Sequence, residues 1–106
     1  MKHDQTKPEV GMGVTRGVGS DCYPFTIVEI ISSNRILVQQ DNAVADVANG
    51  HDYFSNQKWI IYPNIGSPKV LLSYRKKSNC WTEVGQSPKY NRYFIGDRFF
   101  YQDPCF

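Results

Sequence analysis

The sequence has no feature typical of a membrane, metal-binding or secreted protein. No apolar run reaches the roughly 18 residues that a membrane-spanning helix needs. No two of the three cysteines have C-x-x-C spacing, and His3 and His51 stand at no zinc-ligand spacing from them. Residues 1–5 are polar with no apolar stretch behind them, so no secretory signal is expected. We therefore expect no membrane contact, no metal and no cofactor, and free thiols in the cytoplasm.

The length excludes large enzyme folds. A chain of 106 residues allows a single core and is too short for a complete dinucleotide-binding fold or an (α/β) barrel. Hydrophobic residues make up 41% and charged residues 21%, which is the composition of a folded domain rather than a disordered chain. We expect residues 1–9 to form a flexible N-terminal arm and residues 10–106 to form one β-rich domain.

Charged and aromatic residues are divided unevenly along the chain, whose net charge is +2. Residues 1–57 carry four basic and seven acidic side chains, whereas residues 58–106 carry eight basic and three acidic ones. Most of the aromatic residues also lie in the second part. Interleaved basic and aromatic side chains suit a flat anion such as a nucleotide or a nucleic acid. The alternative is a solvated basic face above an aromatic core.

Short β-branched and aromatic runs separated by turn residues indicate antiparallel strands. Residues 32–34 make a good hairpin turn between two such runs. After Asp41 the pattern changes, and either a short helix through residues 43–48, ended by Asn49 and Gly50, or a loop fits. We predict an all-β or strongly β-rich α+β fold, a small antiparallel sheet or barrel with at most one short helix. The expected strands cover residues 25–31, 35–40, 58–62, 70–75 and 80–84, followed by a run over 90–101 that is broken near Gly96.

Four glycines at positions 11, 13, 17 and 19 suggest a phosphate-binding loop at first sight. The Walker pattern needs a Lys-Ser/Thr pair after its last glycine, and the dinucleotide pattern needs a strand before and a helix after the loop. This segment has neither context, because a β-rich run follows it. Tight turns or a strained entry into a strand are the better interpretation.

Apolar side chains fall on both faces of the later strands. Over residues 70–75, Val70, Leu72 and Tyr74 share one face, yet Leu71 lies on the other. A small domain cannot easily cover apolar groups on both faces, and surplus apolar surface marks interfaces. We expect a homo-oligomer, either a dimer or an assembly of dimers. A fully buried central strand is the alternative.

The sequence favours binding over catalysis. His51 and Asp52 follow an expected turn at Asn49 and Gly50, and the sequence pairs His51 with no nucleophile. The carboxylates are scattered along the chain and form no evident acid–base pair. We therefore expect no enzyme activity.

Four residues are candidates for binding a nucleotide. Phe54 could stack on a base, and Asn64, in a turn after Pro63, could present its amide to a base or ribose edge. Arg75 and Arg98 can make planar, bidentate contacts with phosphate. Each of these residues also has an ordinary structural interpretation in the core, in a turn or in an ion pair.

One cluster suits nucleic acid. Arg75, Lys76 and Lys77 form a basic turn, with Tyr74 and Trp81 nearby. The sequence pI of about 8.4 is lower than the value above ~9 that is usual for a dedicated duplex binder. A small β-barrel that binds single-stranded nucleic acid or a protein partner through this hairpin is the alternative function.

Short motifs from about Val10 to the C-terminus carry a resemblance to a known family. They are Gly11-Met12-Gly13-Val14-Thr15, Ser20-Asp21, Thr26-Ile27-Val28-Glu29, Arg75-Lys76-Lys77, Trp81, Gly85, Gly96-Asp97-Arg98, Tyr101, Asp103, Pro104 and Phe106. Through them the sequence resembles small proteins of phages and prophages, and among characterised proteins it looks most like the phage Thoeris anti-defence sponges. It departs from their pattern at Cys22 and Cys80, where that pattern has basic residues.

The resemblance implies a function without turnover in the cytoplasm of the host cell. Such sponges bind cyclic ADP-ribose isomers, and some bind cyclic oligonucleotides, so that the host's immune effector stays inactive. Their sites lie between subunits of a homo-oligomer, with an aromatic ring against adenine and polar or basic groups around the diphosphate. By their spacing, Phe54 and Asn64 could correspond to the stacking aromatic and the nearby Asn.

Overall fold

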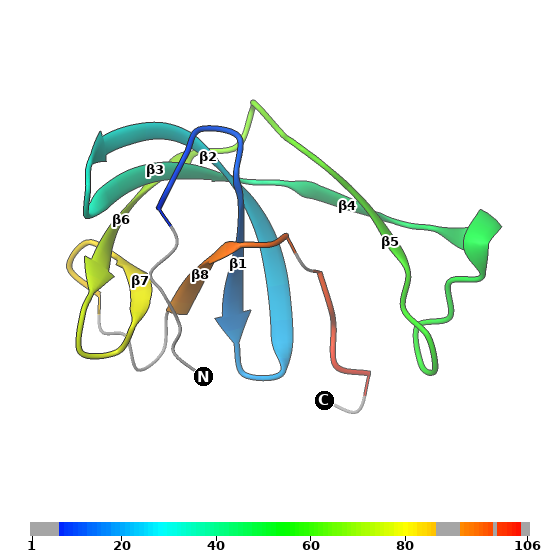
Figure 1. Cartoon of the computed structure of the whole chain (residues 1–106). Helices are drawn as coiled ribbons and strands as arrows, with labels where there is room; N and C mark the ends of the chain where they lie inside the picture. Colours follow the sequence, from blue (N-terminus) through cyan, green and yellow to red (C-terminus); the bar gives the residue numbers. More distant parts are fainter. Residues whose placement is uncertain (1–6, 87–91, 99, 105–106) are drawn as a thin grey trace.

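Six antiparallel strands close into a barrel, and two further strands project from it as a separate ribbon (Figure 1). The structure is a computed structural model and describes residues 7–86, 92–98 and 100–104. The barrel strands are β1 (Gly13–Val18), β2 (Asp21–Ser32), β3 (Arg35–Gln40), β6 (Lys69–Arg75), β7 (Cys80–Glu83) and β8 (Arg92–Gly96). The ribbon consists of β4 (Asn42–Ala45) and β5 (Trp59–Tyr62). The segment that connects these two strands contains a 3-10 turn, η1 (Val47–Asn49). The predicted β-rich fold class is confirmed.

The barrel has the strand order β1-β2-β3-β6-β7-β8, and β8 returns to β1. Its strands follow one another as a meander except that the β4–β5 ribbon is inserted between β3 and β6. Ser33 and Asn34 connect β2 to β3, so the predicted hairpin is confirmed with a two-residue turn. The long strand β2 has register shifts after Ile27 and after Ile30. Such bulges bend a strand and help a small sheet to close on itself.

The core fills the inside of the barrel. The side chains at its centre come from all six barrel strands and alternate with outward-facing residues, as antiparallel strands require. The predicted inward face of β6 is confirmed, because Leu72 is fully buried and Val70 and Tyr74 pack against the core. The buried cluster consists of Val14, Phe25, Ile27, Ile36, Val38, Leu72, Trp81 and Tyr93.

The short helix proposed for residues 43–48 is not formed. Residues Asn42–Ala45 are strand β4, which pairs with β5, and only Val47–Asn49 makes a helical turn. The β-branched Val44 stands directly opposite Ile60, so cross-strand pairing outweighs two turns of marginal helix. Gly50 ends the turn in the left-handed conformation, at φ 89°, as its position predicted.

The glycine-rich segment forms strand β1 and its flanking turns, not a phosphate loop. Gly11 and Gly19 have positive φ at either side of the strand. Gly13 is needed for a different reason: a Cβ there would lie 2.7 Å from Cγ and 2.9 Å from the backbone nitrogen of Arg98. The interpretation as turns and a tight strand entry is confirmed.

Both ends of the chain lie partly outside the described residues. Of the arm expected over residues 1–9, only residues 7–9 are described, and Pro8 is buried. In the last expected strand, residues 90, 91 and 99 are outside the described part. Downstream of β8, Tyr101 makes an isolated antiparallel bridge with Cys22, so this end of the chain runs back along the start of β2.

Candidate functional site

Arg98, two residues after the end of β8, makes a partly buried ion pair. Its Nε is 3.1 Å from Oδ2 of Asp41, whose side chain is fully buried. Thr26 donates to the other carboxylate oxygen of Asp41 at 2.6 Å, and Arg98 Nη2 donates to the Gly11 carbonyl at 2.8 Å. These contacts connect the segment after β8 to the turn before β1, to β2 and to the residue between β3 and β4. They give Arg98 a structural role beside the ligand-binding role that we predicted.

Phe54 lies in the loop that joins η1 to β5, and 77% of its surface is exposed. Oδ1 of Asp52 accepts hydrogen bonds from the backbone N–H groups of Phe54 and Ser55, which fixes the loop. These hydrogen bonds, led by the one from Phe54, lower the pKa of Asp52. The ring of Phe54 packs edge-to-face on Tyr53 at 5.2 Å and leaves a face open for stacking.

Asn64 follows β5 in the turn that leads back to the barrel. Its Nδ2 donates to Oδ1 of Asn42 at 3.3 Å, and its Oδ1 accepts the Gly66 N–H at 3.1 Å. Both ends of the amide therefore already have partners within this chain, and the amide fixes the turn between β5 and β6.

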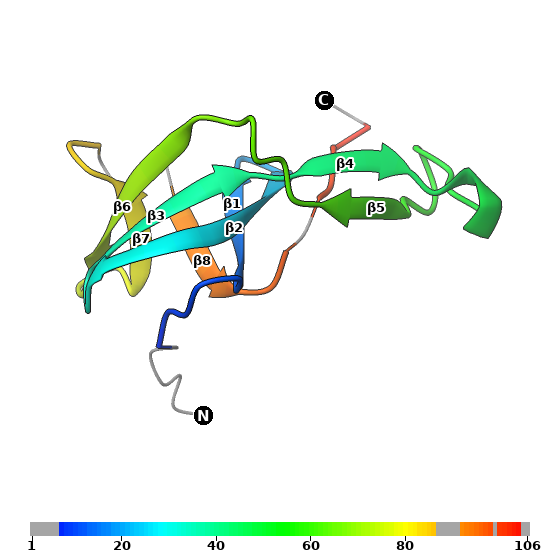
Figure 2. The same ribbon diagram turned by 90° about the horizontal axis from the view of Figure 1, so that it is seen from above.

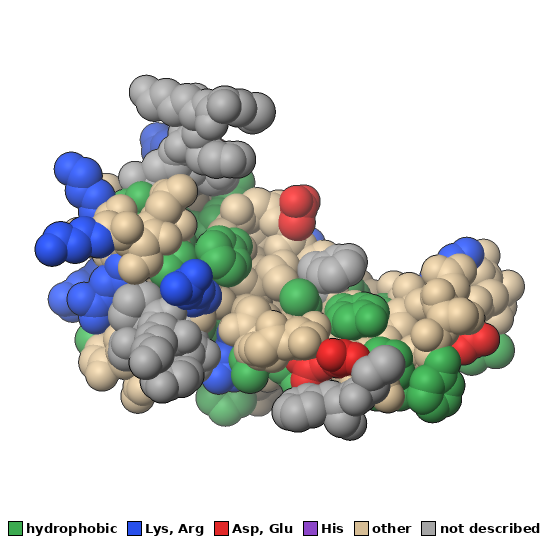
Figure 3. All heavy atoms as spheres, turned by 90° about the horizontal axis from the view of Figure 1, so that it is seen from below, with side chains coloured by type: hydrophobic (Ala, Val, Ile, Leu, Met, Phe, Trp, Pro, Cys, Tyr) green, Lys and Arg blue, Asp and Glu red, His purple; other side chains and the backbone are tan. Residues whose placement is uncertain are grey.

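Arg75 ends strand β6 at the basic turn. Its Nε donates to Oγ1 of Thr82 at 3.2 Å, which orients the guanidinium along β7. The turn surrounds a shallow hollow of about 410 Å³, lined by Tyr74, Arg75, Lys76, Lys77 and Ser78. Figure 3 shows Lys and Arg side chains gathered at one end of the molecule, away from the projecting ribbon. We call this hollow, lined by residues 74–78, the basic hollow.

The four predicted site residues do not form one pocket within a single chain. Both ribbon views place β4 and β5 at one end of the molecule and β6 and β7 at the other (Figures 1 and 2). Phe54 belongs to the ribbon end and Arg75 to the barrel end, along a molecule 40 Å long. A single ligand could contact both residues only if they came from different subunits.

A second polar pocket, which the sequence did not reveal, opens at one end of the barrel. Its volume is about 180 Å³, and Arg16, Gln40, Glu83 and Tyr93 contribute to its wall. The hydroxyl of Tyr93 donates to Oε2 of Glu83 at 3.1 Å, and the guanidinium of Arg16 lies 5.8 Å from the centre of the Tyr93 ring. Burial raises the pKa of Tyr93 above its ordinary range.

The sequence contained one signal for this pocket. Arg16 shares the inward face of β1 with Val14, and a charged residue at an inward-facing position marks the end of a barrel core. The glycines on either side of Arg16 are typical of turns, and they hide the alternation of this strand in the sequence.

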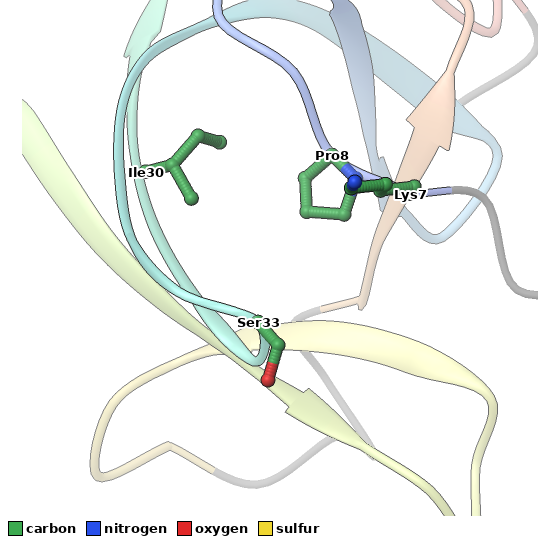
Figure 4. Close-up of a pocket in the computed structure, with 4 residues that line it drawn as sticks. All are labelled: Lys7, Pro8, Ile30 and Ser33. Atoms are coloured by element: carbon green, nitrogen blue, oxygen red, sulfur yellow. The ribbon is translucent and has the colours of Figure 1, made fainter.

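A third cavity, of about 330 Å³, lies between the N-terminal segment and the β2–β3 hairpin. Figure 4 shows Ile30 and Pro8 facing each other across it, with Lys7 and Ser33 at its edge. Its lining is mainly carbon, so it offers little to fix the orientation of a polar ligand.

Cys22, Cys80 and His51 are partly buried or held by contacts within the described part of the chain. Burial raises the pKa of both Cys22 and Cys80, which makes them weaker nucleophiles. Nδ1 of His51 is 3.0 Å from the Lys58 backbone nitrogen, and the ring packs edge-to-face on Trp59.

Among residues 7–86, 92–98 and 100–104, no three potential metal ligands cluster together. The same residues include no helix long and apolar enough to span a membrane.

Comparison with known proteins identified no relative. No family model matches the chain, no curated protein matches it, and no solved structure matches its fold.

Proposed function

We propose that this protein binds a nucleotide-type anion without turning it over, and that the basic hollow receives the phosphate groups. The observation that carries the proposal is the convergence of Arg75, Lys76 and Lys77 around one concavity at the end of β6. Three positive charges around one hollow repel each other, and a bound anion relieves that repulsion.

The chemistry of the hollow suits phosphate. Arg75 presents a planar fork that matches two phosphate oxygens, and its hydrogen bond to Thr82 holds it in place before binding. Tyr74 lies between the basic turn and the core, with its hydroxyl donating to Asn79 at 2.8 Å. Its half-buried ring supplies an aromatic wall beside the cations.

The resemblance to phage anti-defence sponges supplies the ligand to test first, a cyclic ADP-ribose isomer. On this proposal the protein sequesters the signal in the host cytoplasm, and the site is completed by a second subunit whose Phe54 stacks on the base. Effective sequestration requires nanomolar affinity, which corresponds to about −12 kcal/mol. A site shared by two chains supports such affinity because it buries more of the ligand than the open hollow of one chain.

Binding of single-stranded nucleic acid at the same turn is the second candidate. The contiguous charges of Arg75, Lys76 and Lys77 favour it. Trp81 does not, because it is only 3% exposed and belongs to the core, where it cannot stack on a base.

Calorimetric titration of the full chain with a cyclic ADP-ribose isomer, with ADP-ribose and with a short single-stranded oligonucleotide tests the proposal. We expect binding of a nucleotide, and recovery of unmodified ligand after the protein is denatured by heat. The combined variant Arg75→Gln, Lys76→Gln and Lys77→Gln should weaken binding at least about 100-fold, since two lost charge-assisted hydrogen bonds are worth about 3 kcal/mol or more.

The matched control replaces three exposed lysines elsewhere, Lys7, Lys58 and Lys69, by Gln and should bind like the parent. If both variants weakened binding equally, the loss would reflect the net charge of the protein, and the basic hollow would not be the binding site. A hydrolysed product, or no nucleotide binding at all, would refute the proposal. Binding of the oligonucleotide alone, with a steep dependence on salt, would favour the second candidate.

A further inference from the structure

The pocket of about 180 Å³ at the end of the barrel brings an arginine and a glutamate to one cavity. We call this cavity, whose wall includes Arg16, Gln40, Glu83 and Tyr93, the barrel-end pocket. Arg16 belongs to β1 and Glu83 to β7, so these opposite charges meet only because β8 closes the barrel between the two strands. The mouths of β-barrels are common places for ligand sites.

Both charged groups lie against one buried side chain, Tyr93. Its hydroxyl donates to Oε2 of Glu83 at 3.1 Å. The guanidinium carbon of Arg16 lies 5.8 Å from the centre of its ring, which is within the range of a cation–π contact. A carboxylate accepts through two oxygens and a guanidinium donates through five N–H groups, so these contacts use only part of their hydrogen-bonding capacity.

The inner wall of the barrel-end pocket is apolar. Phe25 and Val70 line it together with the ring of Tyr93. Phe25 is buried and packs edge-to-face on Tyr93 at 5.2 Å, and Val70 packs against the barrel core. A ligand can therefore place a hydrocarbon group on this wall while its charged groups meet Arg16 and Glu83.

The rim of the pocket is fixed by hydrogen bonds within the chain. Nε2 of Gln39 donates to the Ser67 carbonyl at 2.8 Å and to the Ile65 carbonyl at 3.2 Å. Oγ of Ser67 donates to the Gln40 carbonyl at 2.9 Å. The segment before β6 is thus held on the end of β3. A rim that is already ordered lowers the entropy cost of binding.

We propose that the barrel-end pocket binds a small aliphatic amino acid, with its carboxylate on Arg16, its ammonium group on Glu83 and its side chain on Phe25. The inference goes beyond the proposed nucleotide site and does not depend on it. At about 30 Å³ for each water molecule, 180 Å³ corresponds to roughly six waters, which is the size of a valine and far below that of a nucleotide.

The opposite charges favour a ligand that carries both signs. Arg16 attracts an anion that Glu83 repels, and the reverse holds for a cation. A zwitterion pairs with both side chains at once, and such charge-assisted hydrogen bonds are the strong ones. Because the two groups lie at the edge of the barrel core, their interactions with a ligand are stronger than they would be in bulk water.

The barrel-end pocket is separate from the basic hollow. Val70 and Arg75, one from each cavity, lie near opposite ends of β6, roughly 16 Å apart at about 3.3 Å per residue. A ligand the size of valine cannot reach both cavities, so the two sites can be tested independently.

Amide NMR titration of the isotope-labelled full chain tests the inference without any substitution. The probes are L-valine, 3-methylbutanoate, which lacks the ammonium group, and isobutylamine, which lacks the carboxylate. L-valine should move the resonances of Arg16, Glu83 and Tyr93, with a dissociation constant of about 1 mM or lower. Each analogue should bind at least about tenfold more weakly, because it loses one charge-assisted hydrogen bond.

Two conservative variants assign the charges. Glu83→Gln keeps an acceptor for the Tyr93 hydroxyl and should abolish the preference for L-valine over 3-methylbutanoate. Arg16→Gln should abolish the preference for L-valine over isobutylamine. The matched controls, Glu29→Gln and Arg35→Gln, remove exposed charges elsewhere in the barrel and should leave both preferences unchanged.

Three results would overturn the inference: no shifts at the barrel end with millimolar L-valine, equal affinity for all three compounds, or preferences that survive in Glu83→Gln and Arg16→Gln. A cyclic ADP-ribose isomer, titrated separately, should instead move residues 74–79. Failure of the amino-acid site is therefore distinguishable from failure of the proposed function.

Discussion

At the scale of single residues, two positions explain how the small barrel is held together. Gly13 allows the backbone of Arg98 to approach β1, and Arg98 in turn neutralises the buried carboxylate of Asp41. A buried carboxylate without a partner costs several kcal/mol, so the glycine and the ion pair depend on each other.

The close approach at Gly13 predicts a large difference between two glycines of one strand. Gly13→Ala should lower the free energy of unfolding by about 1–3 kcal/mol, because its Cβ would clash with the Arg98 backbone. Gly17→Ala places a Cβ where no atom lies within 4 Å and should change stability by less than about 1 kcal/mol. Urea denaturation of both variants measures this. Equal destabilisation would show that the Arg98 contact does not limit position 13.

The buried phenol of Tyr93 predicts a loss of stability at alkaline pH. Burial raises its pKa, so the folded state holds this proton more tightly than the unfolded chain. Its contribution is fully present below the ordinary phenol pKa of about 10 and declines as the pH rises above that value. The free energy of unfolding should therefore decrease from pH 9 to pH 11, and less so in Tyr93→Phe. If the parent and Tyr93→Phe lost stability equally over this pH range, the pKa of Tyr93 would not differ between the folded and unfolded states.

At the scale of elements, the sequence allowed the hairpins to be predicted but not the ribbon. The β2–β3 and β6–β7 hairpins are local, so their turn residues identify them. Strand β4 pairs with β5 across a loop of thirteen intervening residues, and short apolar runs separated by such a loop carry no local signal for pairing. For this reason neither alternative expected near Val44, a short helix or a loop, matches the strand that forms there.

The same difference between local and distant contacts applies to the candidate site. The basic hollow could be recognised because Arg75, Lys76 and Lys77 are consecutive. The pocket at the end of the barrel combines Arg16, Glu83 and Tyr93 from three separate strands, so only the closed barrel brings them together. The partners of Arg98 and Asn64 likewise lie far away in the sequence.

The ribbon should open independently of the barrel. Trp59 connects it to the segment after β8, and burial of a tryptophan is worth about 3–5 kcal/mol when complete. For this half-buried ring, Trp59→Ala should accelerate amide exchange in β4 and β5 about tenfold or more, while amides of Ile36 and Leu72 in the barrel stay protected. Mass-spectrometric hydrogen exchange measures both at once. Equal acceleration in the barrel would mean that ribbon and barrel unfold as one unit.

At the scale of the whole molecule, the two ends of the chain differ in surface chemistry. The basic hollow lies at one end, and the ribbon and its loops, which expose several large apolar side chains, lie at the other. Phe54 and Asn64 belong to the ribbon end, so a ligand in the basic hollow could reach them only on a second chain.

The central claim is that the basic hollow is the ligand site, and amide NMR shift mapping tests it most directly. Titration of the isotope-labelled full chain with a cyclic ADP-ribose isomer should move the resonances of residues 74–79 most, with little change at Arg16 and Gln40 at the end of the barrel. No shifts at saturating ligand, or shifts concentrated at the barrel end, would contradict the claim.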